Sequence, residues 1–436
     1  MSDSQTVGLY LGAKSILQNP GYLETLQKEI GLTHLVIGFS GELSKEILAL
    51  SPFDGTPPSD ECIRSLICRH IDGQPSTTKF DSAKRCAGPH MHVGGNDAEL
   101  RQAIQIAKGL GLAVWMGGGA WTASDFDVLM YCPSQERTNR WYEAVYTYYA
   151  RNYDIDGIDI THARYPMTSY TRGTFLCACD HCAKTAAETG YDMAQMVADI
   201  YDGLARLKQL DGKRFVDICQ HAAGPFDFMQ ILGMKQGIIQ WFKFRSELLG
   251  RNVERFRDAV HAAAGDDFVF GIDTYPASLS MFVGHNHARW AEFSDFASPL
   301  LSHVDIFPMG TLVAWAQFLR GIFPDIAETE ALQVIYRLVG YDSLDMPKTI
   351  GDFALGAPDC EFRNMPLEDF VMLDMAKARL YLPQDTASYP ILQGGGAPHD
   401  WPLETIKTLI AGAEALGHQG VILQGTTALV DFDLKS

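Results

Sequence analysis

The sequence predicts an α/β fold, a (β/α)8 TIM barrel with long insertions after strands 2 and 4. Three observations favour this fold. Short apolar runs alternate with segments of helical composition, and the runs add up to the eight strands of a parallel barrel. The Gly-x-Gly-x-x-Gly fingerprint of open dinucleotide-binding sheets is absent from the sequence. A length of 436 residues fits one elaborated barrel domain over residues 1–436, with insertions at about 41–96 and 167–213.

The elements follow from apolar periodicity and from the positions of glycine and proline. Strands are expected within residues 6–12, 33–40, 112–116, 154–166, 268–275, 295–303, 389–395 and 420–426. Helices are expected at 20–30, 99–110, 139–149, 193–210, 237–264 and 402–416. An additional strand is expected at 215–221, and residues 304–385 hold several helices without a clear strand.

The fourth expected strand carries an acidic side chain toward the barrel axis. Alternate side chains of a strand share a face, so Ile158 and Ile160 point one way while Gly157, Asp159 and Thr161 point the other. If the isoleucines pack on outer helices, Asp159 faces the axis near the C-terminal mouth, where such barrels place their chemistry.

A structural alternative is that Asp156 and Asp159 only cap turns or pair with Arg164. The fifth expected strand favours the functional reading, because Phe270 and Ile272 share one face while Asp273 lies on the other. Two neighbouring strands therefore each direct one carboxylate inward.

Other polar and aromatic residues near strand ends are candidates for binding a substrate. They are Tyr10, Trp121, His162, Arg164, Tyr165, Tyr275, His303, Gln393 and Gln424. Trp121 can also be an ordinary core tryptophan. His90 and His92 can ligate a metal or make simple surface contacts, and Asp400 is read as a helix N-cap before Trp401.

Composition excludes several classes of partner. The net charge is −18, from 35 basic and 53 acidic residues, which argues against binding nucleic acid or a membrane surface. The first residues lack the charged and apolar regions of a signal peptide, and no apolar run is long enough to span a bilayer. We therefore expect a cytoplasmic protein whose nine cysteines are thiols or metal ligands. The oligomeric state is open, with a homo-oligomer one alternative.

Three cysteines have the spacing of a metal site. Cys177, Cys179 and Cys182 form a Cys-x-Cys-x-x-Cys motif whose thiolates can converge on one tetrahedral ion. Cys132 follows the third strand, whose loop adjoins the loop after the fourth, so the four thiolates can make a closed, structural zinc site. The alternative is that Cys132 is an ordinary thiol and that His181, or no residue, completes the set.

This arrangement of cysteines resembles the zinc site of family 42 β-galactosidases, which also join a Cys-Pro to a Cys-x-Cys-x-x-Cys motif. The stretch from Asp156 to Pro166 and the run from Asp273 to His285 are similar to uncharacterised, family-10-like glycosyl hydrolase proteins. The resemblance implies a barrel that acts on a sugar, without identifying the sugar. We expect no organic cofactor.

The sequence departs from family 42 at the catalytic positions. That family places glutamates after strands four and seven, whereas Thr161 and Gln393 occupy the comparable places here. We therefore expect Asp159 and Asp273 to be the pair of carboxyl groups that glycoside hydrolysis requires. The alternatives are a carbohydrate-binding barrel without hydrolysis, and a sugar isomerase or lyase that uses His162 with Asp159 and a divalent ion.

Overall fold

Nine parallel strands form one sheet at the centre of the molecule. The computed structural model describes residues 5–19, 21–55, 57–76, 96–121, 131–166, 173–221, 224–304, 308–353, 365–395 and 401–425. The strands are β1 (Thr6–Tyr10), β2 (His34–Gly38), β3 (Ala113–Gly119), β4 (Gly157–Thr161), β5 (Val269–Thr274), β6 (Phe296–Pro299), β7 (Ala387–Ser388), β8 (Ile391–Gln393) and β9 (Gly420–Gln424). Their order is β7-β6-β5-β4-β3-β2-β1-β9-β8.

The sheet curls until the two ends of this order meet. Strands β7 and β8 are separated only by Tyr389 and Pro390, so they belong to one extended stretch of chain. Leu300, directly after β6, forms a parallel bridge to Ile391 in β8, and the N–H of Leu301 donates to the carbonyl of Ile391 at 3.0 Å. The strands thus surround an interior into which alternate side chains point.

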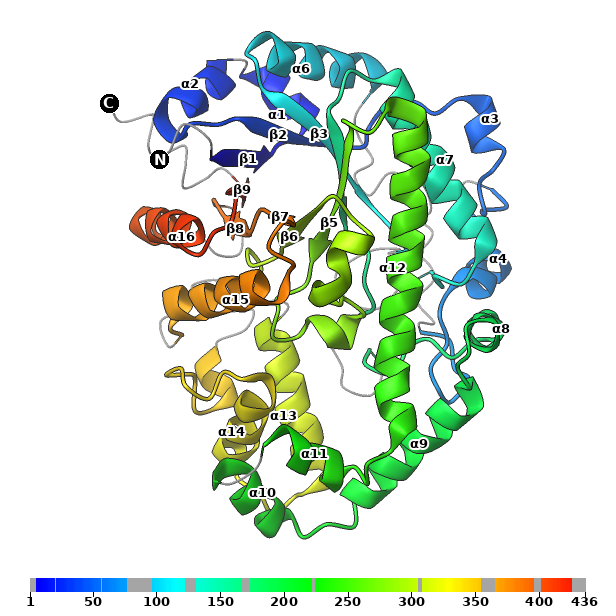
Figure 1. The fold of residues 1–436 in the computed structure, drawn as a ribbon, viewed down its shortest axis with the longest axis vertical. Coiled ribbons are helices and arrows are strands. Elements are labelled where there is room, and N and C mark those ends of the chain that lie inside the picture. Colours follow the sequence, from blue (N-terminus) through cyan, green and yellow to red (C-terminus); the bar gives the residue numbers. More distant parts are fainter. Residues whose placement is uncertain are drawn as a thin grey trace.

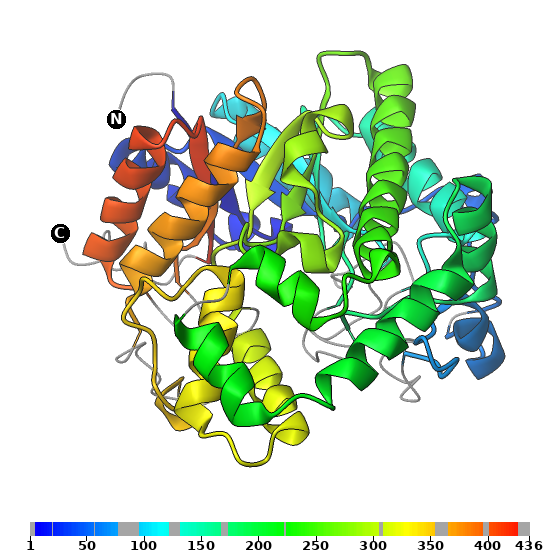
Figure 2. The same ribbon diagram turned by 60° about the horizontal axis from the view of Figure 1, so that its bottom comes forward.

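Helices cover the outside of the sheet and extend beyond one end of it (Figure 1). The α-helices are α1 (Ala13–Gln18), α2 (Gly21–Ile30), α3 (Lys45–Leu48), α4 (Asp60–Leu66), α6 (Asp97–Gly109), α7 (Glu136–Asn152), α8 (Asp180–Glu188), α9 (Met193–Leu207), α10 (Gly212–His221), α11 (Pro225–Ile231), α12 (Gln236–Ala264), α13 (Gly310–Ile322), α14 (Glu328–Val339), α15 (Leu367–Tyr381) and α16 (Leu403–Ala415). Short 3-10 helices are η1 (Ser280–Val283), η2 (His287–Glu292) and η4 (Ile350–Phe353). Both views show α15 and α16 on one side of the sheet and the long helix α12 on the other (Figure 2). No helix in the described ranges combines the length and apolarity needed to cross a bilayer.

Alternation along β4 explains where its acid points. Ile158 and Ile160 are buried on the side that faces the covering helices, and Asp159 lies on the interior side. The residues paired with Asp159 on the two neighbouring strands are Gly117 and Gly271. Neither neighbour has a side chain, and other residues fill the space that one would take: a Cβ at Gly271 would clash with the ring of Phe296, and one at Gly117 would lie 3.1 Å from Val36.

Aromatic rings fill the interior on the N-terminal side of the two acids. Trp115, paired with Gly157 at the start of β4, stacks on Phe296 with ring centroids 4.6 Å apart. Tyr389 and His34 pack against the same indole at 5.6 and 4.9 Å. This aromatic layer separates the acids from solvent at the N-terminal side of the strands.

Most elements predicted from the sequence are confirmed, with shifted boundaries. The additional strand expected at 215–221 is wrong, because these residues belong to helix α10. In that segment Phe215, Val216 and Cys219 are buried whereas Ile218 is half exposed, which is a helical and not an alternating pattern. The third strand extends through the glycines to Gly119, and the sixth ends at Pro299.

Candidate functional site

The two acids predicted from the sequence meet inside the curled sheet. The hydroxyl of Tyr10 donates to Oδ2 of Asp159 at 2.6 Å and lies 3.1 Å from Oδ1 of Asp273. Strands β2 and β3 separate Tyr10 from Asp159 in the sheet, so the tyrosine reaches the acid across the interior. The Tyr10 ring passes beside Gly117, where a Cβ would be in ordinary van der Waals contact with Cε1 of Tyr10, at 3.7 Å, and in tighter contact with Val36, at 3.1 Å.

Burial controls the charge of this pair. Only 1% of Asp159 and 5% of Asp273 is exposed. Burial raises the pKa of Asp159 to about 6, against opposing hydrogen bonds from Tyr10 and Asp273. Burial and the negative charge of Asp159 raise the pKa of Asp273 well above its ordinary value, although a hydrogen bond from Thr161 acts in the opposite direction. Asp273 therefore binds its proton more tightly than Asp159, so the two carboxyl groups differ in proton affinity.

Several predicted binding residues lie half-buried or buried near the ends of the same strands. His162 follows β4 in a left-handed backbone conformation (φ 60°), and its Nδ1 lies 2.9 Å from the hydroxyl of Thr161. The hydroxyl of Ser302 donates to Oε1 of Gln424 at 2.6 Å and contacts Nδ1 of His303 at 2.9 Å. The end of β9 and the segments after β4 and β6 thus place polar groups at the C-terminal ends of the strands.

Three further binding candidates, all aromatic, are enclosed by protein. Trp121 is completely buried, donates its indole N–H to Asn139 at 2.8 Å and packs against Phe256, so it is a core tryptophan. Tyr165 is also completely buried, and Tyr275 is 1% exposed. Their rings therefore have no surface to offer a substrate in this conformation.

The remaining candidates have local structural contacts. The amide of Gln393 donates to the carbonyl of Gly395 at 3.0 Å, and the guanidinium carbon of Arg164 lies 4.8 Å from the ring centre of Tyr275. Asp156 accepts from Lys108 and from the backbone N–H of Val114, both at 2.7 Å. Asp156 therefore has a structural role, through Lys108 and not through Arg164. His90, His92 and Asp400 lie outside the described residues.

A cluster of four buried cysteines forms the second candidate site. Its members are Cys132, Cys177, Cys179 and Cys182, and their sulfur atoms all lie within 4.8 Å of one another. A tetrahedral ion with metal–sulfur bonds of about 2.3 Å would hold the sulfurs about 3.8 Å apart. The sulfur of Cys132 lies 3.4 Å from those of Cys179 and Cys182. The cluster can therefore hold a metal ion, and His181, which is exposed, is not part of it.

Two features around the cluster were not predicted from the sequence. Cys68 is completely buried, and hydrogen bonds with Cys132 and Cys177 contribute to its pKa, which burial raises well above its ordinary value. The N–H of Arg69 donates to the sulfur of Cys177 at 3.2 Å. A metal-bound thiolate commonly accepts such outer bonds. The only signal in the sequence was the group of cysteines in the insertion after the second strand.

Arg245 on α12 is a buried cation near these thiols. It is 1% exposed, donates to the carbonyl of Thr174 at 2.5 Å and stacks 3.9 Å from the ring centre of Tyr165. Burial lowers its pKa to about 10, and negative charge on Tyr165, and after it on Cys68, Cys177 or Cys182, acts in the opposite direction. A buried guanidinium is therefore best stabilised when the cluster carries negative charge, as a set of four thiolates does around a divalent ion.

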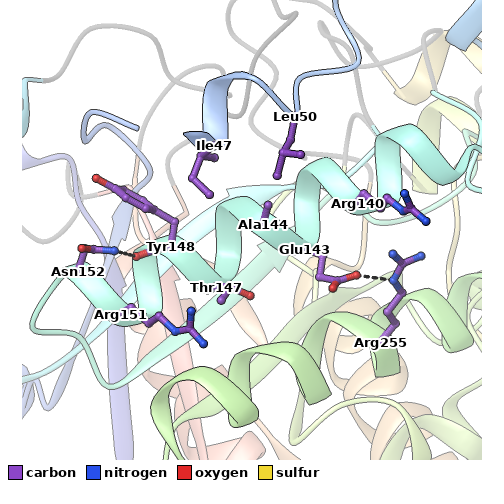
Figure 3. A pocket seen from close by; sticks show the side chains of 10 residues that line it. All are labelled: Ile47, Leu50, Arg140, Glu143, Ala144, Thr147, Tyr148, Arg151, Asn152 and Arg255. Atoms are coloured by element: carbon purple, nitrogen blue, oxygen red, sulfur yellow. Dashed lines mark hydrogen bonds and ion pairs between the residues drawn. The ribbon is translucent and has the colours of Figure 1, made fainter. Parts of the chain in front are cut away.

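A separate cavity lies on the outer helical surface (Figure 3). Its lining comes from α3, α7 and α12 and from residues beside them, and includes no strand residue. An ion pair between Glu143 and Arg255, at 2.5 Å, crosses its wall. This cavity contains neither acid of the pair and none of the clustered cysteines.

No family model and no curated protein matches this sequence. Among solved structures, the chain is similar to the PgaB (BpsB) glycoside hydrolase domain from Bordetella bronchiseptica, with 11% identity and a TM-score of 0.47, over 99% of this chain and 96% of that one. It is similar to the catalytic domain of β-amylase from Paenibacillus polymyxa, with 9% identity and a TM-score of 0.44, over 99% and 97% of the two chains. The spore cortex-lytic enzyme SleL from Bacillus cereus shares 7% identity at a TM-score of 0.42, over 97% and 71%. Similarity at this level does not transfer an activity to this chain.

Proposed function

We propose that this protein is a glycoside hydrolase that cleaves a small glycoside or oligosaccharide with Asp159 and Asp273 as its carboxyl pair. The observation that supports this most is the hydroxyl of Tyr10, which lies within hydrogen-bonding distance of both acids. Glycoside cleavage needs one carboxyl group that protonates the leaving oxygen and a second that attacks or activates water. Two buried acids with different proton affinities match these two tasks.

The pKa shifts suggest which acid performs each task. Asp273, whose pKa is raised by burial and by the charge of Asp159, keeps its proton at neutral pH and is our general acid. Asp159, with a pKa of about 6 and a short hydrogen bond from Tyr10, is largely ionised at pH 7 and is our nucleophile. Tyr10 then orients the ionised carboxylate, a role different from the substrate contact expected from the sequence.

The spacing of the acids favours retention of the anomeric configuration. The two carboxyl groups contact the same hydroxyl, at 2.6 and 3.1 Å, and a hydrogen bond between them contributes to the pKa of each, so they lie closer than these two bonds placed end to end, about 5.7 Å. Inverting enzymes keep their carboxyl groups roughly 6.5–9.5 Å apart to admit a water molecule, and retaining enzymes roughly 5–5.5 Å apart. The pair is closer than an inverting enzyme requires, so we propose a covalent glycosyl-enzyme on Asp159 that is hydrolysed in a second step.

We count β7 and β8 as one strand, which makes the curled sheet an eight-stranded barrel within a single domain. We propose zinc as the ion of the cysteine cluster, because four thiolates are the usual ligand set of structural zinc. His162, Arg164, His303, Gln393 and Gln424 are the proposed contacts for sugar hydroxyls. The cytoplasmic location stays a prediction.

Turnover of a panel of aryl glycosides tests the proposal. We expect the unchanged protein to release the aryl group from at least one member, and Asp159→Asn and Asp273→Asn each to lose more than about 100-fold in kcat. Asp156→Asn is the matched control, because Asp156 lies three residues from Asp159 but pairs with Lys108. Equal turnover by all four proteins would show that the pair is not catalytic.

A carbohydrate-binding barrel without hydrolysis is the second candidate. The deep burial of both acids favours it, since a glycosidic oxygen must approach them closely to be protonated. Calorimetric binding of an oligosaccharide without turnover of any glycoside would distinguish it. Among the described residues, the one group of three or more potential metal ligands is the cysteine cluster, so no observation favours an isomerase or lyase that uses His162.

A further inference from the structure

The segments that follow the two acidic strands are joined at three consecutive residues. The carbonyl of Ala163, after β4, lies 3.0 Å from Nε2 of His285, which comes from the segment after β5. The side chain of the next residue, Arg164, stacks on Tyr275, and the N–H of Tyr165 donates to the carbonyl of Val283 at 3.0 Å. The two segments therefore form one connected unit above the acids.

His285 joins backbone groups on both sides of this unit. The N–H of Tyr275 donates to Nδ1 of His285 at 2.9 Å, which leaves Nε2 to carry the proton that it donates to Ala163. The ring is completely buried and packs 5.0 Å from the ring of Trp290. Burial lowers the pKa of His285 to about 3, so this neutral form is present across the pH range of ordinary activity.

We propose that His285 is a positioning residue that fixes the separation of Asp159 and Asp273. Ala163 lies four residues after Asp159, and Tyr275 lies two residues after Asp273. One rigid ring therefore holds the backbone that follows each acid. The inference rests on the proposed function, because the separation of the pair matters only if the two acids act on one bond.

The alternative is that His285 only fills space in the core. A neighbouring residue offers a matched control, because His287 is also buried (3% exposed), yet neither of its ring nitrogens has a hydrogen-bond partner in the part of the chain that the structure describes. His285→Leu removes both bonds of the clamp, and His287→Leu removes a buried imidazole without breaking any. If His285→Leu does not fold, His285→Asn serves instead, because its shorter amide can meet Tyr275 but cannot extend to Ala163.

Turnover and carboxyl titration test the proposal together. We expect His285→Leu to lose about 10- to 100-fold in kcat with less than about a 3-fold change in KM, because small misplacements of catalytic groups cost rate. In protein labelled with ¹³C at aspartate side-chain carboxyls, and assigned with Asp159→Asn and Asp273→Asn, the two titrations should move closer together as the pair separates. His285→Asn should lose at least about 3-fold in kcat, and His287→Leu should match the unchanged protein in both measurements.

The results separate failure of this inference from failure of the proposed function. If the unchanged protein hydrolyses no glycoside, the proposed function fails, whereas the carboxyl titration still reports whether His285 sets the spacing of the acids. Titrations and kcat that are the same in His285→Leu, His285→Asn and the unchanged protein would overturn the positioning role. So would equal losses in His285→Leu and His287→Leu, which would show a packing effect alone.

Discussion

Replacing Asp159 by asparagine should make the folded protein more stable at neutral pH. The pKa of this carboxyl is about 6 in the fold against an ordinary value of 3.8. A difference of about 2 in pKa corresponds to about 3 kcal/mol of unfavourable free energy once the group ionises. The amide oxygen of asparagine can still accept from Tyr10, although weakening this charge-assisted bond costs about 1 kcal/mol. We therefore expect Asp159→Asn to raise the free energy of unfolding by about 2 kcal/mol at pH 7.5.

The stability gained by Asp159→Asn should depend on pH. Because the folded pKa lies above the unfolded one, the neutral carboxyl contributes its full stability below about pH 4 and loses it as the pH rises through about 6. The gain from Asp159→Asn should thus appear between pH 4 and 6 and stay constant above that range. Urea denaturation at a series of pH values measures it, with Asp156→Asn as the control that should lose stability. A variant that is no more stable at pH 7.5, or a gain that does not vary with pH, would refute the reasoning.

Three further predictions concern Tyr10, Cys132 and Asp156. Tyr10→Phe removes a hydrogen bond that lowers the pKa of Asp159, so the acid limb of the pH profile of kcat/KM should move to higher pH and kcat should fall about 10- to 100-fold; an unmoved limb would contradict this. Cys132→Ser should reduce the bound metal, measured by elemental analysis of the purified protein, from about one ion per chain toward none, whereas Cys62→Ser, outside the cluster, should leave it unchanged. Asp156→Asn should lower the free energy of unfolding by about 0.5–1 kcal/mol in urea, because it weakens a partly exposed ion pair with Lys108, and a loss of kcat there would count against the assigned pair.

Alternation within single strands was enough to predict the acidic pair. Asp159 lies opposite Ile158 and Ile160, and Asp273 lies opposite Phe270 and Ile272, in short buried runs. A parallel sheet brings neighbouring strands to one edge. Alternation within a strand could not identify Tyr10 as the residue that contacts both acids. Tyr10 is 149 positions from Asp159 along the chain, and their contact depends on the curvature of the whole sheet.

The wrong or incomplete expectations concern residues outside the strands. Trp121 and His162 both follow strands in left-handed backbone conformations, with φ of 57° and 60°, so the period of two that orders side chains in a strand no longer applies there. Spacing identified the four clustered cysteines because three lie within six residues, but Cys68 approaches them from a separate insertion. The expected strand at 215–221 was too short for its apolar period to distinguish a helix.

Trapping the enzyme with activated 2-deoxy-2-fluoro glycosides tests the catalytic pair most directly. The fluorine slows hydrolysis of a glycosyl-enzyme, so a retaining enzyme accumulates its covalent intermediate, which peptide mass spectrometry can locate. We predict one added sugar per chain, attached to Asp159, and no labelling of Asp159→Asn. A sugar attached to any other residue, or turnover that releases the product with inverted anomeric configuration, would contradict the assignment.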